Sequence, residues 1–260
     1  MLRKLLSDPR VADIDVDSPD RIVRHREILQ SKKMIAQVFG EFYKVVLDLE
    51  SRYLTAKGLR IEIGAGSSLM KTVDPNILIT DVVPQTGHDR VVDAQNMPFE
   101  DGSVATVFGI HCFHHLPDPY KFLSELVRVT PPGGGAVLID PYYSPASDVV
   151  FKRLFSNERF DKKGPALTPM SGPMSDANQA LSYIVFKREK EKLKRDFPQL
   201  EIAYQRPLYN YVRYLASGGI NFRQLLPNFM IPMLKGGEVI MIPLSPLLAL
   251  HHVLVVRHSP

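Results

Sequence analysis

A glycine-rich turn between two short apolar runs places the strongest constraint on how this chain folds. The stretch "LRIEIGAGSSLMKTVDPNILITD" runs from Leu59 to Asp81. Its first part predicts a buried strand, and "GAGSS" predicts a turn whose glycines permit positive φ and let a ligand approach the backbone. We expect a helix to begin after the turn, with its N-terminal N–H groups available to an anion, and a second strand to end at Asp81. Strand, turn, helix and strand in this order indicate a parallel α/β sheet.

The acidic residues around this turn favour a nucleoside-containing cofactor. Asp81 follows the turn by about 20 residues, the spacing at which a carboxylate accepts ribose hydroxyls in such folds. NAD and S-adenosylmethionine both carry a ribose that would lie at Asp81. A structural turn without a ligand is the third alternative. The dinucleotide fingerprint fails because its third glycine is replaced by Leu69. Glu62 lies inside the strand, where a buried carboxylate needs a partner that the ammonium group of a methionine moiety can supply.

Three motifs extend this interpretation along the chain. The pattern E-x-G-x-G-x-[GS] is met by Glu62, Gly64, Gly66 and Ser68, and it is followed by "VVDAQNMPFEDGSVATVFGIHCFHHLPDP" and "LSELVRVTPPGGGAVLID". Over about residues 59–141 the chain resembles class I S-adenosylmethionine-dependent methyltransferases, the broad group that includes enzymes of the ubiquinone and menaquinone biosynthesis type. The resemblance implies an α/β, Rossmann-like doubly wound fold with a mostly parallel seven-stranded sheet, a helical N-terminal extension and an insertion after strand five.

The resemblance also implies which residues bind S-adenosyl-L-methionine. Glu62 would organise the amino end of the cofactor, Asp81 would accept the ribose hydroxyls, and Asp93 would accept from the adenine amino group. The residues expected to line the cofactor are Glu62, Gly64, Ala65, Gly66, Ser68, Asp81, Val82, Asp93, Ala94, Ile110 and His111. Ser68 departs from the family's common glycine, and "TPPGGG" carries an extra proline and glycine, but neither change removes an essential contact.

The histidine cluster "HCFHH", His111–His115, ends the fourth expected strand, at the edge where ligands bind in open α/β sheets. An acceptor hydroxyl must lose a proton during methyl transfer, and histidine is the usual base near neutral pH. His111 is the first candidate base and His114 the second; the alternative is that His114 and His115 only shape the following turn. We expect no metal there, because side chains alternate along a strand and no distant ligand completes a set.

We interpret the chain as one methyltransferase domain, residues 1–260, with four parts. Residues 1–56 form a helical N-terminal cap that begins at Ser18 or Asp20, and residues 57–141 form the cofactor-binding core. Residues 142–200, rich in proline, glycine, serine and lysine, are an insertion with a loop and a helix, and residues 201–260 contribute the C-terminal strands. The uncharged run Val239–Val256 has the minimum length of a membrane span, but its prolines favour a strand, a turn and a buried strand.

The charge, the motifs and the cysteine content of the chain bear on its binding partners and its compartment. The net charge of +4 is mild, and the basic run Lys187–Arg195 contains two glutamates, as a solvated helix face does, so we expect no nucleic-acid partner. The motif "DPYY" from Asp140 follows the fifth strand, whereas base-modifying methyltransferases carry a similar motif after the fourth. The single Cys112 fits a reducing compartment, and we expect a cytoplasmic protein, with peripheral membrane contact left open.

The acceptor has to be sought in the C-terminal part. There Arg206, Arg213 and Arg223 lie among tyrosines, which suits a polar acceptor with hydroxyl or anionic groups, and a neighbouring apolar run suits a lipid tail. The combination resembles methyltransferases of bacterial surface-polysaccharide and glycolipid synthesis. We therefore expect O-methylation of a sugar, a lipid-linked saccharide or another small hydroxyl-bearing acceptor. The alternatives are a small-molecule or quinone-type C-methyltransferase and a cofactor-binding protein without catalysis.

Overall fold

A seven-stranded sheet forms the centre of the computed structural model, which describes residues 6–154, 158–172 and 174–259. Its strands lie in the order β3-β2-β1-β4-β5-β7-β6. The strands are β1 (Leu59–Ile63), β2 (Leu78–Asp81), β3 (Arg90–Val91), β4 (Val104–Ile110), β5 (Gly135–Pro141), β6 (Leu200–Pro207) and β7 (His251–His258). Neighbouring strands are parallel except β7, which runs antiparallel to β5 and to β6. The predicted mostly parallel, seven-stranded α/β sheet is therefore confirmed.

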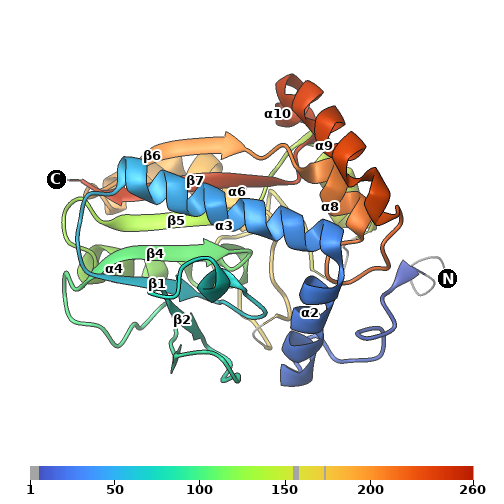
Figure 1. Ribbon diagram of the computed structural model, residues 1–260. Helices are drawn as coiled ribbons and strands as arrows, with labels where there is room; N and C mark the ends of the chain where they lie inside the picture. Colours follow the sequence, from blue (N-terminus) through green and yellow to red (C-terminus); the bar gives the residue numbers. More distant parts are fainter. Residues whose placement is uncertain (1–5, 155–157, 173, 260) are drawn as a thin grey trace.

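Helices cover both faces of this sheet (Figure 1). They are α2 (Pro19–Ser31), α3 (Lys33–Tyr53), α4 (Pro119–Val129), α5 (Pro145–Arg153), α6 (Leu181–Tyr183), α7 (Lys190–Asp196), α8 (Tyr211–Ser217), α9 (Ile231–Ile240) and α10 (Ser245–Leu248). Short 3-10 or π-helical turns are η1 (Met70–Thr72), η2 (Phe113–His115), η3 (Ile184–Arg188), η4 (Asn228–Met230) and η5 (Ile242–Leu244). The basic run Lys187–Arg195 begins at the end of η3 and continues into α7, where Lys192 pairs with Asp196 and Lys194 pairs with Glu191.

Alternating side chains of the strands divide the core into two layers. On β5, Val137 and Ile139 pack with α3 on one face, while Ala136 and Leu138 pack with α4 and the insertion on the other. This alternation follows from the pleat of a strand, which sends successive side chains to opposite faces. Because both faces are covered, the whole of β5 is buried.

The N-terminal cap is helical, as the sequence predicts. Ser18 is the residue that begins α2, since its side chain accepts a hydrogen bond from the backbone N–H of Asp20. Helix α3 lies lengthwise across one face of the sheet, and α2 stands at the carboxyl edge of the parallel strands (Figure 1). The cap therefore reaches the edge at which ligands bind in open α/β sheets.

Two local predictions were wrong. The glycine turn leads only into the three-residue turn η1, so no α-helix N-terminus is available there to an anion. The run Val239–Val256 was expected to form a strand, a turn and a buried strand; the buried strand is present as β7, but residues 239–250 contain the end of α9, η5 and α10 in place of the first strand. The second error comes from a short apolar run, whose periodicity does not distinguish a strand from a buried or surface helix.

The described residues contain no single helix that is long and apolar enough to cross a membrane. The segments Asn228–Ile240 and Ile242–Leu248 reach that length and composition only as a pair, bent by 63° at their junction. These segments lie beside α8 at the same end of the molecule as α2 (Figure 1).

Candidate active site

The glycine turn after β1 is shaped by close packing at one glycine and by open space at the other. Gly64 and Gly66 have φ of 54° and 49°, values that residues other than glycine rarely adopt. A Cβ on Gly64 would lie 2.2 Å from the sulfur of Cys112, whereas a Cβ on Gly66 would meet no atom within 4 Å. The turn thus packs against the end of β4 on one side and leaves room for a ligand on the other.

Asp81 ties the turn to the end of β2. One carboxylate oxygen accepts the backbone N–H of Gly66 at 2.7 Å, and the other accepts the backbone N–H of Val83 at 2.9 Å. Each carboxylate oxygen can accept a further hydrogen bond, so the carboxylate keeps capacity for a ribose. The second strand ends at Asp81, as predicted, whereas the hydrogen bond between this carboxylate and the glycine turn was not predicted.

Glu62 is a buried acid with a single side-chain donor. It is 1% exposed, and the hydroxyl of Ser68 donates to it at 2.7 Å. Burial raises the pKa of Glu62 to about 8, against the opposing effect of the Ser68 hydrogen bond, and the negative charge of Asp81 adds to the rise. At pH 7 a carboxyl group with this pKa is mostly protonated. A cation bound beside it would lower the pKa and so favour the ionised carboxylate. The residues therefore fit a ligand with an ammonium group.

The remaining residues predicted to bind the cofactor follow β2, β3 and β4. The backbone N–H of Val92 donates to the carbonyl of Asp81 at 2.9 Å, which brings Asp93 and Ala94 next to the end of β2. Asp93 is exposed, Ala94 is buried, and Val82 is 52% exposed. Contacts of these residues, and of Ala65 and Ile110, with a cofactor stay predictions.

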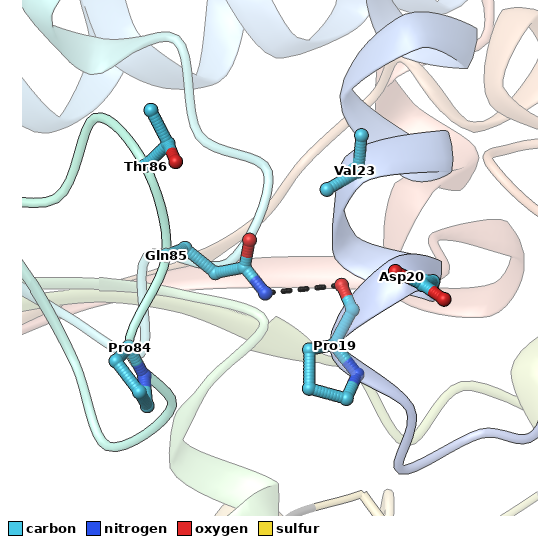
Figure 2. A pocket seen from close by; sticks show the side chains of 6 residues that line it. All are labelled: Pro19, Asp20, Val23, Pro84, Gln85 and Thr86. Atoms are coloured by element: carbon cyan, nitrogen blue, oxygen red, sulfur yellow. Dashed lines mark hydrogen bonds between the residues drawn. The ribbon is translucent and has the colours of Figure 1, made fainter.

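Helix α2 covers the glycine turn, which the sequence did not predict. Arg26 donates to the carbonyl of Thr86 at 2.8 Å and to that of Gly66 at 3.4 Å. Figure 2 shows Gln85 reaching across to the carbonyl of Pro19, a hydrogen bond of 3.0 Å. The facing residues line an open cavity of about 520 Å³, namely Pro19, Asp20, Val23, Pro84, Gln85 and Thr86. The N-terminal cap and the loop after β2 thus lie next to the glycine turn of the predicted cofactor site.

His111 lies in a box of aromatic rings at the end of β4. Its φ of 55° turns the chain sharply, while its backbone N–H still donates to the carbonyl of Ile139 at 2.8 Å. Its ring stacks on that of His251 at 4.5 Å between centroids and meets the rings of Phe42 at 5.7 Å and Tyr214 at 6.2 Å. Within the described residues its Nε2 has no hydrogen-bond partner. Burial and the charge of neighbouring His114 lower the pKa of His111 to about 3, so the imidazole is neutral at pH 7.

His114 is held between two acids. Its Nδ1 lies 2.7 Å from the carboxylate of Asp140 on β5, and its Nε2 lies 3.3 Å from that of Glu158. Burial alone would lower the pKa of His114, but the charges and hydrogen bonds of these two acids outweigh it and raise the pKa to about 10. An imidazole that already carries its proton cannot act as a general base, so the structure favours His111 over His114 for that role.

Glu158 and His251 are site residues that sequence analysis missed. Glu158 comes from the insertion, in a stretch without periodicity, and it also lies 3.9 Å from Nε2 of His115. His251 and His252 were interpreted only as part of a buried strand. A signal was present, because a histidine pair at the start of β7 lies opposite Pro141 and Asp140 at the end of β5. His252 is held by the hydroxyl of Ser182 at 2.7 Å.

The arginines predicted for the acceptor do not act as one group. Arg213 is fully buried and pairs with Glu41 at 2.7 Å and with Glu238 at 2.5 Å. It connects α3, α8 and α9 and is a structural residue, whereas Arg206 and Arg223 are exposed. The tyrosines after Asp140 pack against the insertion, since Tyr143 meets Tyr183 at 4.9 Å.

Comparison with known proteins finds methyltransferase matches to part of the chain. A family model described as a methyltransferase domain matches residues 73–138. The chain is 44% identical over 50 residues to a chloroplastic tocopherol O-methyltransferase of Arabidopsis thaliana. It is 43% identical over 49 residues to an ajmaline N-methyltransferase of Rauvolfia serpentina. Each match covers 19% of this chain, which spans only 14% and 17% of the lengths of these relatives.

A solved structure is similar over most of the chain. It belongs to a Galdieria sulphuraria protein assigned as a sarcosine dimethylglycine methyltransferase, with a TM-score of 0.51 and 12% sequence identity. The match covers 92% of this chain and 98% of that one. At this identity the likeness shows the fold alone.

Proposed function

We propose that the chain is a class I S-adenosylmethionine-dependent methyltransferase that methylates a hydroxyl oxygen of a sugar, a glycolipid or another small acceptor. The observation that carries this proposal is His111, a neutral imidazole whose Nε2 has no partner within the described residues. An oxygen acceptor needs such a group, because its proton has to leave during the transfer. The two curated relatives are named for transfer to oxygen and to nitrogen, and the histidine favours oxygen here.

The cofactor side of the reaction rests on Glu62, Asp81 and the glycine turn. When bound, S-adenosyl-L-methionine supplies a methyl group on a sulfonium that is already activated for displacement. Glu62 would bind its ammonium group, and Asp81 would bind its ribose hydroxyls. Gly66 leaves the space that the backbone approach requires. The task of these residues is to hold the methyl donor in line with the acceptor and to exclude water.

The acceptor side rests on the box around His111. The rings of Phe42, Tyr214 and His251 are buried around His111, and we propose that the apolar part of the acceptor packs beside them. The low pKa of His111 does not prevent its function as proton acceptor. A hydroxyl oxygen that gains a methyl group becomes strongly acidic, so a neutral imidazole at hydrogen-bond distance accepts its proton.

An exposed apolar surface supports an acceptor that is linked to lipid. We define the apolar surface as the exposed side chains of Leu225, Phe229, Met233, Val239, Ile240, Ile242, Leu244 and Leu247. Phe229 and Ile240 are 82% and 81% exposed. Between residues 225 and 248 the only exposed charged side chain is Lys235, because Glu238 is buried against Arg213. Such a surface is typical of contact with a lipid bilayer. We accordingly propose a cytoplasmic enzyme that contacts a membrane surface peripherally.

Methyl transfer to a defined acceptor panel tests the catalytic proposal. Purified protein would be incubated with methyl-labelled cofactor and with free sugars, lipid-linked saccharides or hydroquinones, and the products would be examined for O-methyl or C-methyl groups. We expect O-methylation of a saccharide. C-methylation of a hydroquinone would support the quinone-type alternative, and cofactor binding without transfer across the whole panel would support a non-catalytic cofactor-binding protein.

Co-sedimentation with phosphatidylcholine vesicles tests the membrane contact separately. We expect wild-type protein to sediment with vesicles and the double variant Phe229→Ser, Ile240→Ser to remain in solution. Val149→Ser is the matched control, because Val149 is 52% exposed on α5, outside the apolar surface. Equal sedimentation of all three proteins, or none by wild type, would refute this part of the proposal.

A further inference from the structure

His114, His115 and Glu158 form a compact cluster of potential metal ligands. Nε2 of His114 lies 3.3 Å from one carboxylate oxygen of Glu158, and Nε2 of His115 lies 3.9 Å from the other. All three ligand atoms lie within 4.8 Å of one another. Ligands of a tetrahedral zinc ion are about 3.4 Å apart, so small side-chain rotations would bring these atoms onto one ion. We propose that this cluster binds a divalent transition-metal ion.

The backbone after β4 explains why two consecutive histidines converge. Side chains alternate along a strand, and on that ground the sequence analysis expected no metal at this cluster. The chain, however, leaves β4 at Ile110 and forms the 3-10 turn η2, in which the rings of His114 and His115 lie 4.2 Å apart. The insertion then supplies Glu158, the distant ligand that the sequence did not reveal.

Asp140 fixes the orientation that a metal ligand needs. Its carboxylate is fully buried on β5 and lies 2.7 Å from Nδ1 of His114, so Nε2 of the same ring points to Glu158. Histidines that bind metals commonly donate their second N–H to a carboxylate in this way. The arrangement is built into the sheet, since Asp140 belongs to a strand and not to a loop.

The charge and type of these groups indicate the class of metal. His114 carries a proton in the metal-free protein, so a divalent cation would displace the proton on Nε2, and the charges of Asp140 and Glu158 that favour the protonated ring would favour the cation in its place. Two imidazoles with one carboxylate suit Zn²⁺, Co²⁺ or Fe²⁺ better than Mg²⁺ or Ca²⁺, which prefer all-oxygen ligands. Three protein ligands leave at least one coordination position open, as catalytic sites do. The side chains are 5%, 12% and 19% exposed, so the open position is sheltered but reachable.

The open position gives the ion a role that rests on the proposed O-methylation. A hydroxyl oxygen bound to a divalent cation has a lowered pKa, and its proton would pass to the neutral His111. The oxygen then forms its bond to the methyl carbon as the bond from that carbon to sulfur breaks. His111 directly follows β4 and His114 lies three residues later in η2, so both groups are at the same edge of the sheet.

Metal binding is measured directly, without the methyl acceptor. Chelator-treated full-length protein would be dialysed against Zn²⁺ or Co²⁺, and bound metal would be counted by mass spectrometry, with Mg²⁺ as a comparison ion. We expect about one equivalent of Zn²⁺ per chain and visible Co²⁺ absorption bands of low-symmetry coordination. We expect His115→Gln and Glu158→Gln to weaken Zn²⁺ binding at least tenfold.

Matched controls keep the experiment decisive. His258→Gln and Glu201→Gln make the same changes at partly or fully exposed positions of β7 and β6 and should retain wild-type affinity. Thermal unfolding of every variant without metal verifies folding. Absence of Zn²⁺ and Co²⁺ binding by wild type, or undiminished binding by both cluster variants, would overturn the proposal even if methyl transfer is observed. Conversely, metal binding without methyl transfer would uphold the site and count against the proposed function.

Discussion

The two halves of the sheet edge are built in opposite ways. At β1 and β2 the residues that fit the cofactor come from one stretch, Glu62 to Asp81, in which the backbone N–H of Gly66 donates to the carboxylate of Asp81. At β4, β5 and β7 the histidine region combines α3, η2, the insertion and β7, which lie far apart in the sequence and meet through side-chain contacts and through the pairing of β7 with β5. The first half is local in sequence and the second is not. The difference suggests a division of labour, in which a constant cofactor site adjoins an acceptor site that the surrounding elements can vary.

Replacement of His111 should produce the largest effect. It should lower the rate of methyl transfer and leave cofactor binding unchanged. We expect His111→Gln to lower kcat by about 10²–10³-fold, because the proton acceptor is lost. The dissociation constant of S-adenosylhomocysteine should change by less than about threefold, as calorimetry would measure. A loss of cofactor affinity comparable to the loss in kcat would break the comparison.

Gly64→Ala tests the packing that joins the two halves. The new Cβ would lie 2.2 Å from the sulfur of Cys112 at a φ of 54°, so we expect the free energy of unfolding to fall by about 2–4 kcal/mol. Urea unfolding would measure this change. Gly66→Ala is the matched control, with the strained φ but no atom within 4 Å, and should cost only about 1 kcal/mol. Cys112→Gly in the Gly64→Ala background should recover part of the loss; equal costs for the two alanine variants would contradict the packing.

Asp81→Ala should affect the cofactor half in the way that His111→Gln affects the other. We expect affinity for S-adenosylhomocysteine to fall about 10–100-fold, since both the ribose acceptor and the anchor of the Gly66 N–H are lost. Asp81→Asn, which keeps one acceptor oxygen, should lose less. If His111→Gln weakened binding more than Asp81→Ala, the roles would have to be exchanged.

The smallest expected effect is the release of a proton from Glu62 when the cofactor binds. The pKa of Glu62 is raised from 4.5 to about 8 in the folded protein. The unfolded chain therefore ionises first, and this group lowers the free energy of unfolding as the pH rises from about 4.5 to 8. An ammonium ligand would lower that pKa, so binding at pH 7 should release close to one proton and should tighten as the pH approaches 8. Calorimetry in buffers of different ionisation enthalpy measures the release. Glu62→Gln should abolish it, and a wild-type release near zero would argue against the assigned contact.

The same contrast explains what the sequence could predict. The sheet and the N-terminal helices follow from local periodicity, and the position of Asp81 at the end of β2 follows from spacing within one stretch. Glu158 could not be found, because a carboxylate in an aperiodic loop carries no mark of the histidines that it meets. His115 was assigned no ligand role because a strand was assumed where the chain forms a 3-10 turn. Arg213 was assigned to the acceptor because sequence does not show that Glu41 and Glu238 bury it.

Arg213 and Tyr214 are neighbours in α8, and they connect two surfaces of the molecule. The guanidinium of Arg213 pairs with Glu238 of α9, while the ring of Tyr214 lies against those of His111 and His251. One peptide unit therefore separates the anchor of the apolar surface from the wall of the acceptor box. If the proposed membrane contact tilted α9, the ion pair of Glu238 with Arg213 would pull on α8 and so shift the ring of Tyr214 that lies beside His111.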